Sequence, residues 1–160
     1  MVDIEHLQFG LETFGDIVAN EDGSLQTAAA SIRQIVREGQ LADELGIQVF
    51  GVGEHHRPDY SVSSPETVLA AISTVTKQIK LATAVTVLSS DDPVRVYERF
   101  ATLDALSNGR AQVMLGRGSF TESFPLFGYD LTDYDDLFNE KLGLYDALRN
   151  EKAVTWSGKF

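Results

Sequence analysis

The 160-residue sequence has no cysteine, only 4 prolines, and no apolar run close to the about 20 residues that cross a bilayer. The absence of cysteine excludes disulfides, thiolate nucleophiles and cysteine-ligated metal sites. Residues 1–5 lack the basic segment that begins a signal peptide. We therefore expect a cytoplasmic protein that does not associate with a membrane.

Basic residues are also scarce, since 13 Lys and Arg face 24 Asp and Glu, for a net charge of -11. A field of this sign repels phosphate backbones, so nucleic acid is not an expected partner. With 43% hydrophobic residues, the composition is otherwise that of an ordinary globular domain with one sizeable core. We expect a single unit over residues 1–160.

Apolar runs of strand length alternate with longer segments of helical periodicity. Strands are predicted at 7–11, 47–52, 79–88 and 112–115. Helices are predicted to begin after Ser24, Ser64, Asp92 and Asp133. Gly46 and the Asn108-Gly109 pair suit the ends of the first and third helices. The second helix is expected to carry an apolar stripe of Val68, Ile72, Val75 and Ile79.

This alternation predicts right-handed βαβ crossovers and a parallel sheet. A doubly wound fold would need a Gly-x-Gly-x-x-Gly turn after the first strand, and the segment 10–15 does not supply one. Units of roughly 30 to 40 residues would make an eight-unit barrel of about 300 residues. We therefore favour an α/β fold of the TIM-type (β/α)8 barrel class, represented here by its first four β/α units.

Polar residues directly after the second predicted strand are the strongest candidates for chemistry, because barrel active sites form at the C-terminal ends of strands. Glu54, His55 and His56 lie there. In extended chain Glu54 and His56 share one side and His55 takes the other, so the two histidines are poor ligands for one metal. His6 is the only other histidine and is predicted at the opposite end of the first strand. We expect no metal.

A single imidazole at a strand end suits general acid–base chemistry, because its pKa lies near neutral pH. Packing against the sheet explains the same residues equally well. Two other strand ends carry weaker signals. Gly116-Arg117-Gly118 could hold a phosphate or form an ordinary turn, and the small residues of 82–87 could receive a flat ring or pack against bulky neighbours. The aromatic segment 120–127 fits either an apolar lid or ordinary loop packing.

Several motifs occur in a fixed order along the chain, and together they resemble a known family. These are Phe9-Gly10, Val52-Gly53-Glu54-His55-His56, Leu81-Ala82-Thr83-Ala84-Val85, Asp92-Pro93-Val94-Arg95, Leu103-Asp104-Ala105-Leu106-Ser107-Asn108-Gly109-Arg110, Leu115-Gly116-Arg117-Gly118 and Phe127-Gly128-Tyr129-Asp130. Over nearly its whole length the chain resembles the bacterial luciferase-like, flavin-dependent oxidoreductases.

The resemblance implies a barrel that binds FMN, supplied in reduced form by a flavin reductase, and that uses O2 to oxidise a small organic substrate. His55 falls on the family's catalytic histidine, which implies an acid/base role at the flavin. Ala84-Val85 falls on a non-prolyl cis peptide under the flavin ring, and Arg117 on a residue that helps hold the FMN phosphate. The expected cofactor-binding residues are Glu54, Ala84, Val85, Gly116, Arg117 and Gly118.

The family continues into a second half of the barrel beyond the segment 156–160. We therefore expect this chain alone to bind FMN weakly or not at all, and to expose apolar edges at its first and fourth strands. A homodimer is expected, because family dimers pack through helices of this half. The alternative functions are an F420-dependent dehydrogenase on the same fold and a non-catalytic flavin-binding or assembly fragment.

Overall fold

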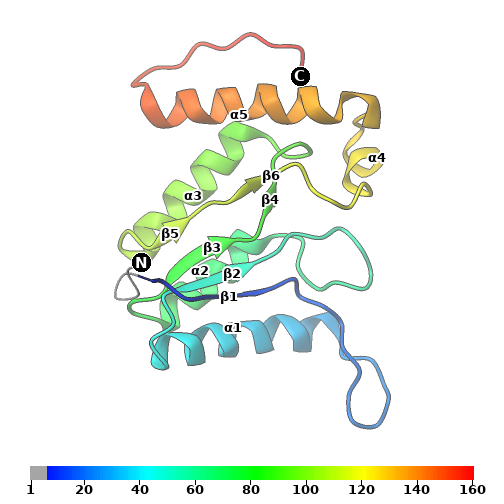
Figure 1. Cartoon of the computed structure of the whole chain (residues 1–160), viewed down its shortest axis with the longest axis vertical. Coiled ribbons are helices and arrows are strands. Elements are labelled where there is room, and N and C mark those ends of the chain that lie inside the picture. The colour runs from blue at the N-terminus through cyan, green and yellow to red at the C-terminus, as the bar shows by residue number, and fades with distance from the viewer. Residues whose placement is uncertain (1–6) are drawn as a thin grey trace, which may run out of the picture.

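The computed structural model describes residues 7–160, so His6 lies outside the described residues. A four-stranded parallel sheet runs through the molecule in the order β1-β2-β3-β5 (Figure 1). Its strands are β1 (Gly10–Thr13), β2 (Val49–Val52), β3 (Lys80–Thr83) and β5 (Ala111–Gln112). Two short strands, β4 (Thr86–Val87) and β6 (Leu115–Gly116), form a second parallel pair beyond β3 and β5. The prediction of a parallel α/β arrangement is confirmed.

Helices follow the strands in the expected alternation. They are α1 (Ala28–Glu44), α2 (Pro65–Val75), α3 (Pro93–Ser107), α4 (Ser123–Phe127) and α5 (Tyr134–Asn150), with a 3-10 turn, η2 (Leu131–Asp133), before α5. Each long helix packs against the next, in the order α1, α2, α3 and α5. Figure 1 shows the sheet in front of α2, with α5 crossing beyond β4 and β6. None of the helices within residues 7–160 is long and apolar enough to span a membrane.

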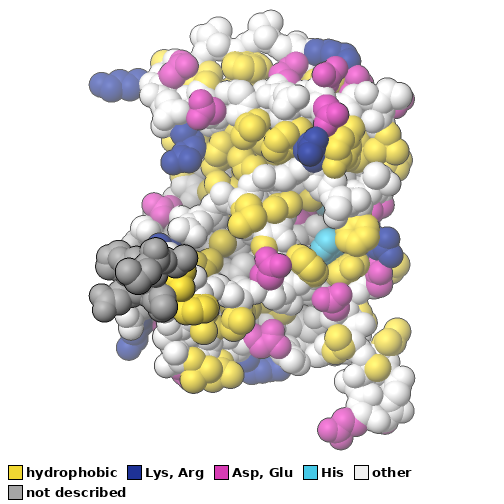
Figure 2. Space-filling view, in the orientation of Figure 1, with side chains coloured by type: hydrophobic (Ala, Val, Ile, Leu, Met, Phe, Trp, Pro, Cys, Tyr) yellow, Lys and Arg dark blue, Asp and Glu magenta, His cyan; other side chains and the backbone are white. Residues whose placement is uncertain are grey.

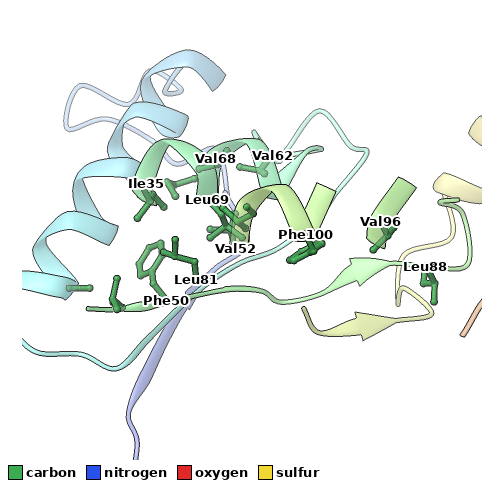
Figure 3. Close-up of a cluster of buried hydrophobic side chains, with 14 of the residues drawn as sticks. Ile35, Phe50, Val52, Val62, Val68, Leu69, Leu81, Leu88, Val96 and Phe100 are labelled. Atoms are coloured by element: carbon green, nitrogen blue, oxygen red, sulfur yellow. The ribbon is translucent and has the colours of Figure 1, made fainter. Parts of the chain in front are cut away.

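The core lies between the sheet and the helices, because the strands turn their large side chains to that side. Val52 and Leu81 are fully buried there beside Leu69 of α2 (Figure 3), and Ile72 of α2 belongs to the same buried cluster. The other side of the same strands carries Glu12, Val49 and Lys80 together with the small residues Gly51 and Ala82. The sheet therefore has one face that packs against the helices and one open face.

Two charged residues close the N-terminal end of the sheet. The carboxylate of Asp43 accepts the backbone N–H groups of residues 77, 78 and 79 at 2.8, 2.9 and 2.7 Å. The guanidinium of Arg110 donates five hydrogen bonds, to Ser73 O, Thr76 O and Oγ1, Ile79 O and Ser107 O. These contacts join α1, α2, α3 and the turn before β3 at the N-terminal end of the sheet.

Several predicted boundaries were wrong for identifiable reasons. The first strand begins at Gly10 rather than at residue 7, because the ladder with β2 starts at the Gly10–Val49 pair. The first helix is capped by Thr27, whose Oγ1 accepts from Ala30 N, while Ser24 donates from both N and Oγ to Asp22 in the preceding turn. Ser64 is the N-cap residue of α2 as predicted, although its side chain makes no capping hydrogen bond. Val75 is 44% exposed and Ile79 lies beyond the helix, so the predicted stripe is shorter.

The third and fourth predicted strands are each interrupted. Thr83 Oγ1 exchanges hydrogen bonds with the backbone O and N of Met114, both at 3.3 Å, where ladder bonds would continue. Asp92 and Asn108 behave as predicted: Asp92 caps α3 by accepting from Val94 N and Arg95 N, and Asn108 is left-handed at its end. The segment 120–127 contains the short helix α4 rather than only a loop. Exposed apolar side chains occur at the first and fourth predicted strands, as expected: Leu11 in β1, Phe9 and Phe14 on either side of it, and Met114 between β5 and β6.

Candidate active site

His55 follows β2 and lies inside a cage of aromatic rings. Its ring stacks on Tyr60 at 4.1 Å between centroids and meets Phe14 and Phe120 edge-on at 5.6 and 5.1 Å. Its backbone N–H donates to Val62 O at 2.9 Å, which fixes the loop after the strand. The buried Nε2 atom has no hydrogen-bond partner in the part of the chain that the structure describes. The imidazole is therefore held in place by apolar contacts with one polar atom free.

A cavity of about 240 Å³ adjoins this cage, and we call it the inner cavity. It is lined from four loops that follow strands, by residues that include His55, Ala84, Val85, Phe120 and Gly118. Glu54 and His56 line it as well. Five of the predicted site residues are thus brought to one cavity: Glu54, His55, Ala84, Val85 and Gly118.

Glu54 and His56 form a pair beside His55, on the shared side that strand alternation predicts. Glu54 Oε1 lies 2.9 Å from His56 Nε2, and the other oxygen, Oε2, accepts Val87 N at 2.9 Å. The side chains are only 8% and 12% exposed, respectively. Glu54 thereby ties the end of β2 to β4, with both carboxylate oxygens already engaged.

Two glycines, one in β2 and one directly after it, pack closely against neighbouring segments beside the inner cavity. A Cβ on Gly51 would lie 3.2 Å from Ala84 Cβ, and one on Gly53 would lie 3.0 Å from the Phe14 ring. The Ala84–Val85 peptide bond is cis, as the resemblance implied. Gly51 and Gly53 are themselves buried, so glycine at these positions allows Ala84 and Phe14 to pack closely against β2 and the loop that follows it.

Gly116 and Arg117 do not line the inner cavity. Gly116 packs directly under Val85, since a Cβ there would lie 2.5 Å from Val85 Cγ2. Arg117 extends away, with its guanidinium 2.6 Å from Asp135 and 5.6 Å from the centre of the Tyr134 ring. Its side chain is 54% exposed. The cofactor role of Arg117 stays a prediction.

The two histidines have pKa values shifted in opposite directions. Burial in the aromatic cage lowers the pKa of His55 from 6.5, although Glu122, Asp16 and Glu54 oppose the effect. The hydrogen bond that His56 makes to the Glu54 carboxylate raises the pKa of His56 above 6.5, and burial only partly offsets it. At neutral pH, His55 is consequently neutral, whereas His56 is closer to carrying a proton.

Sequence reasoning named the segment 120–127, which contains Phe120, as an apolar lid or as loop packing, but it did not predict that three rings surround His55. Phe14 comes two residues after the polar Glu12 of the first strand, which could have marked it as a strand-end residue. Tyr60 and Phe120 lie in loops without any periodic pattern, and only the tertiary fold brings them to His55. Within residues 7–160, no group of three or more His, Cys, Asp or Glu residues has the arrangement of a metal site.

Comparisons with known proteins agree with this geometry. Residues 13–160 match the family described as Luciferase-like monooxygenase. The limonene 1,2-monooxygenase of Rhodococcus erythropolis is 31% identical over 148 residues, which are 92% of this chain and 38% of that protein. The crystal structure of monooxygenase RslO1 from Streptomyces bottropensis superposes with a TM-score of 0.85 at 26% identity, covering 96% of this chain and 46% of RslO1.

Two further solved structures share the fold and belong to proteins that use different cofactors. The oxygenating constituent of 3,6-diketocamphane monooxygenase from Pseudomonas putida, in complex with FMN, has a TM-score of 0.84 at 21% identity over 95% of this chain and 41% of its own. An F420-dependent secondary alcohol dehydrogenase has a TM-score of 0.73 at 21% identity over 96% of this chain and 45% of its own. The chain spans less than half the length of each of these four proteins. With a family match that covers residues 13–160 and the parallel β/α fold of a partial TIM barrel, this chain belongs to the luciferase-like monooxygenase family.

Proposed function

We propose that this chain forms the catalytic-histidine half of an FMN-dependent monooxygenase, which uses reduced FMN and O2 to oxidise a small organic substrate. The observation that carries the proposal is the unpartnered Nε2 of His55, buried beside the inner cavity and the Ala84–Val85 peptide. Buried polar atoms normally have partners, so a buried imidazole nitrogen without one, beside a cavity, is a candidate for contact with a ligand.

The surface beside His55 fits a flat ring. Ala84 and Gly118 contribute little side-chain bulk to the lining of the inner cavity, which also includes the cis Ala84–Val85 peptide. Gly116 supports Val85 from beneath. Arg117 is proposed to hold the FMN phosphate after leaving Asp135, a step that costs no more than about 1 kcal/mol because the ion pair is exposed.

When bound in reduced form, FMN would supply the electrons for O2 chemistry. The chain's own contribution is acid–base and steric. Neutral His55 accepts or returns a proton at Nε2, and the Tyr60 and Phe120 rings shield that atom from bulk water. Glu54 stays bound to Val87 N and His56 throughout, which keeps the loop after β2 in register with β4.

A second candidate is hydride transfer with F420 and no O2, because an F420-dependent dehydrogenase has the same fold over 96% of this chain. The proposed partners of the FMN enzyme are a flavin reductase and a second copy of the chain. A non-catalytic flavin-binding or assembly role is the third candidate.

Oxygen uptake driven by NADPH and a flavin reductase distinguishes these functions. In the complete barrel, protein-dependent O2 consumption is expected with FMN and a carbonyl or alkene substrate, and none with F420. His55→Asn should lower turnover by roughly 10²–10⁴, the range of general acid–base catalysis, with circular dichroism unchanged. Turnover equal to that of the unmodified protein would contradict the role of His55.

Absorbance titration with FMN tests the chain by itself. We expect weak binding or none by the 160 residues, because the relatives contain more than twice this length. A dissociation constant in the micromolar range or below would contradict that expectation and make the chain sufficient for the cofactor.

A further inference from the structure

His56 lines the same inner cavity as His55 but has opposite surroundings. Three aromatic rings surround His55, whereas His56 pairs with a carboxylate and contacts one ring, Phe127, edge-on at 5.0 Å. The reaction assigned above uses only His55. The second imidazole is therefore a buried titratable group without a role.

The contacts of Glu54 determine which nitrogen of His56 can exchange a proton. Both Glu54 oxygens are engaged, one by Val87 N–H and the other by His56 Nε2. A carboxylate accepts only, so the His56 proton resides on Nε2 in the neutral ring. Nδ1 has no partner among the residues that the structure describes, which leaves it as the exchanging atom.

A second cavity, the outer cavity, reaches His56 from another direction. It has a volume of about 380 Å³ and is lined by Glu54 and His56 together with Ser64, Glu66, Asp91 and Arg99. Arg99 pairs with Asp91, and their side chains are 38% and 23% exposed, so the lining reaches the surface. His55 does not line it. Glu54 and His56 are thus shared between a polar outer cavity and the mainly apolar inner cavity.

We propose that His56 is a second acid–base residue of this site, that Glu54 positions it, and that the outer cavity renews its proton. The proposal rests on the function proposed above. The imidazolium gives the proton on Nδ1 to an oxygen atom of a ligand in the inner cavity, so one N–H bond breaks and one O–H bond forms. The neutral ring then takes a proton at Nδ1 from hydrated protons in the outer cavity. No electrons are exchanged.

The charges around the two rings support a role for His55 as the base and for His56 as the acid. Glu54, Glu122 and Asp91 face His56 and raise its pKa, while Glu66 and Arg99 complete the charged lining of the outer cavity. His55 keeps a lowered pKa in its cage. Two neighbouring groups whose environments separate their pKa values in this way suit paired roles, one as base and one as acid.

Histidine NMR on the 160-residue chain tests the arrangement without flavin. The protein contains 3 histidines, so His55→Asn and His56→Asn assign the signals. Long-range ¹H–¹⁵N spectra should show neutral His56 as the Nε2–H tautomer, with a higher proton affinity than His55. Glu54→Gln should reduce the proton affinity of His56 at least about tenfold, because it removes the paired charge.

Glu122→Gln is the matched control, because Glu122 also lines the inner cavity but makes no hydrogen bond to His56. It should reduce the His56 proton affinity much less than Glu54→Gln does. Equal effects of the two variants, an Nδ1–H tautomer, or a His56 that titrates below His55 would each overturn the proposal. Thermal melting of every variant shows that the fold is retained.

The pH profile of O2 consumption in the complete FMN-loaded barrel separates this proposal from the proposed function. With His56→Gln, the fall in rate at high pH should disappear and the remaining rate should be lower, while FMN affinity is unchanged within about twofold. If the original protein and His56→Gln both consume O2 with FMN and have identical pH profiles, the acid role of His56 is contradicted but the proposed function is not. No consumption by any variant would contradict the monooxygenase, and the NMR result would then decide whether the pair has the proposed arrangement.

Discussion

The two ends of the parallel sheet differ in how completely their polar groups are paired. At the N-terminal end, Asp43 accepts three backbone N–H groups and Arg110 donates five hydrogen bonds. At the C-terminal end, four buried side-chain atoms make no hydrogen bond within residues 7–160: His55 Nε2, Ser89 Oγ, Arg99 Nε and Ser123 Oγ. The charged side chains at the N-terminal end are therefore fully hydrogen-bonded, whereas the C-terminal end retains polar atoms that can bind a ligand.

The contrast between the two ends separates residues that stabilise the fold from residues that are open to a ligand. A buried donor or acceptor without a partner costs about 1–3 kcal/mol, so such atoms persist where something other than stability keeps them. Exposed apolar side chains also lie on the open side of the sheet, which does not pack against the helices. Figure 2 shows yellow side chains gathered on the open face of the sheet and beneath α5. Changes at the N-terminal end should therefore affect folding, and changes at the C-terminal end should affect chemistry.

Arg110→Met should have the largest effect on stability. Methionine retains the apolar stem but leaves four backbone carbonyl groups and Thr76 Oγ1 without their charged donor. We expect the free energy of unfolding to fall by about 3 kcal/mol, because hydrogen bonds to charged groups contribute about 1.5–3 kcal/mol each and some acceptors regain water. Urea denaturation followed by circular dichroism measures the change.

Arg95→Met is the matched control, because it makes the same substitution at an exposed arginine. Arg95 is 73% exposed and pairs only with Glu98 at 3.3 Å, so its loss should cost less than about 1 kcal/mol. Similar losses in the two variants would show that the bonded end of the sheet is no more important for folding than its surface.

Much of the fold and part of the site could be predicted from sequence, because those features are local. The helix start at Asp92 and the left-handed Asn108 depend on neighbouring backbone atoms. The pairing of Glu54 with His56 depends on the two-residue period of extended chain. Local pattern decides each of these, and the structure confirms them.

The features that sequence reasoning missed depend on segments far apart in the chain. The cage around His55 combines Phe14, Tyr60 and Phe120 from three loops. Asp43 binds the turn at 77–79 from another helix. The predicted Ser24 cap was wrong because Asp22 competes for the same hydroxyl. In each case a tertiary or competing contact determines the result, and periodicity carries no information about it.

Asp43→Asn should have an intermediate effect that depends on pH. Burial opposes ionisation of Asp43, but the backbone donors at 77, 79 and 78 and the charge of Arg110 outweigh it and lower its pKa below 3.8. The stabilisation is therefore complete above pH 3.8 and is lost as the pH falls through the lower, folded-state pKa. We expect a loss of about 1–2 kcal/mol at pH 7 and a smaller loss near pH 2, measured by urea denaturation at both values. A pH-independent loss would show that the charge of Asp43 is not the source of its effect.

His55→Leu should change stability least, although it replaces the residue proposed to be essential for activity. Leucine has a similar volume, fits the aromatic cage formed by Phe14, Tyr60 and Phe120, and removes the buried Nε2 that has no protein partner. We expect the free energy of unfolding to stay within about 1 kcal/mol of the original value or to rise, as at sites where function opposes stability. The change is measured by urea denaturation beside Arg110→Met. A loss as large as that of Arg110→Met would mean that His55 is a packing residue, and the contrast between the two ends of the sheet would then not separate folding from chemistry.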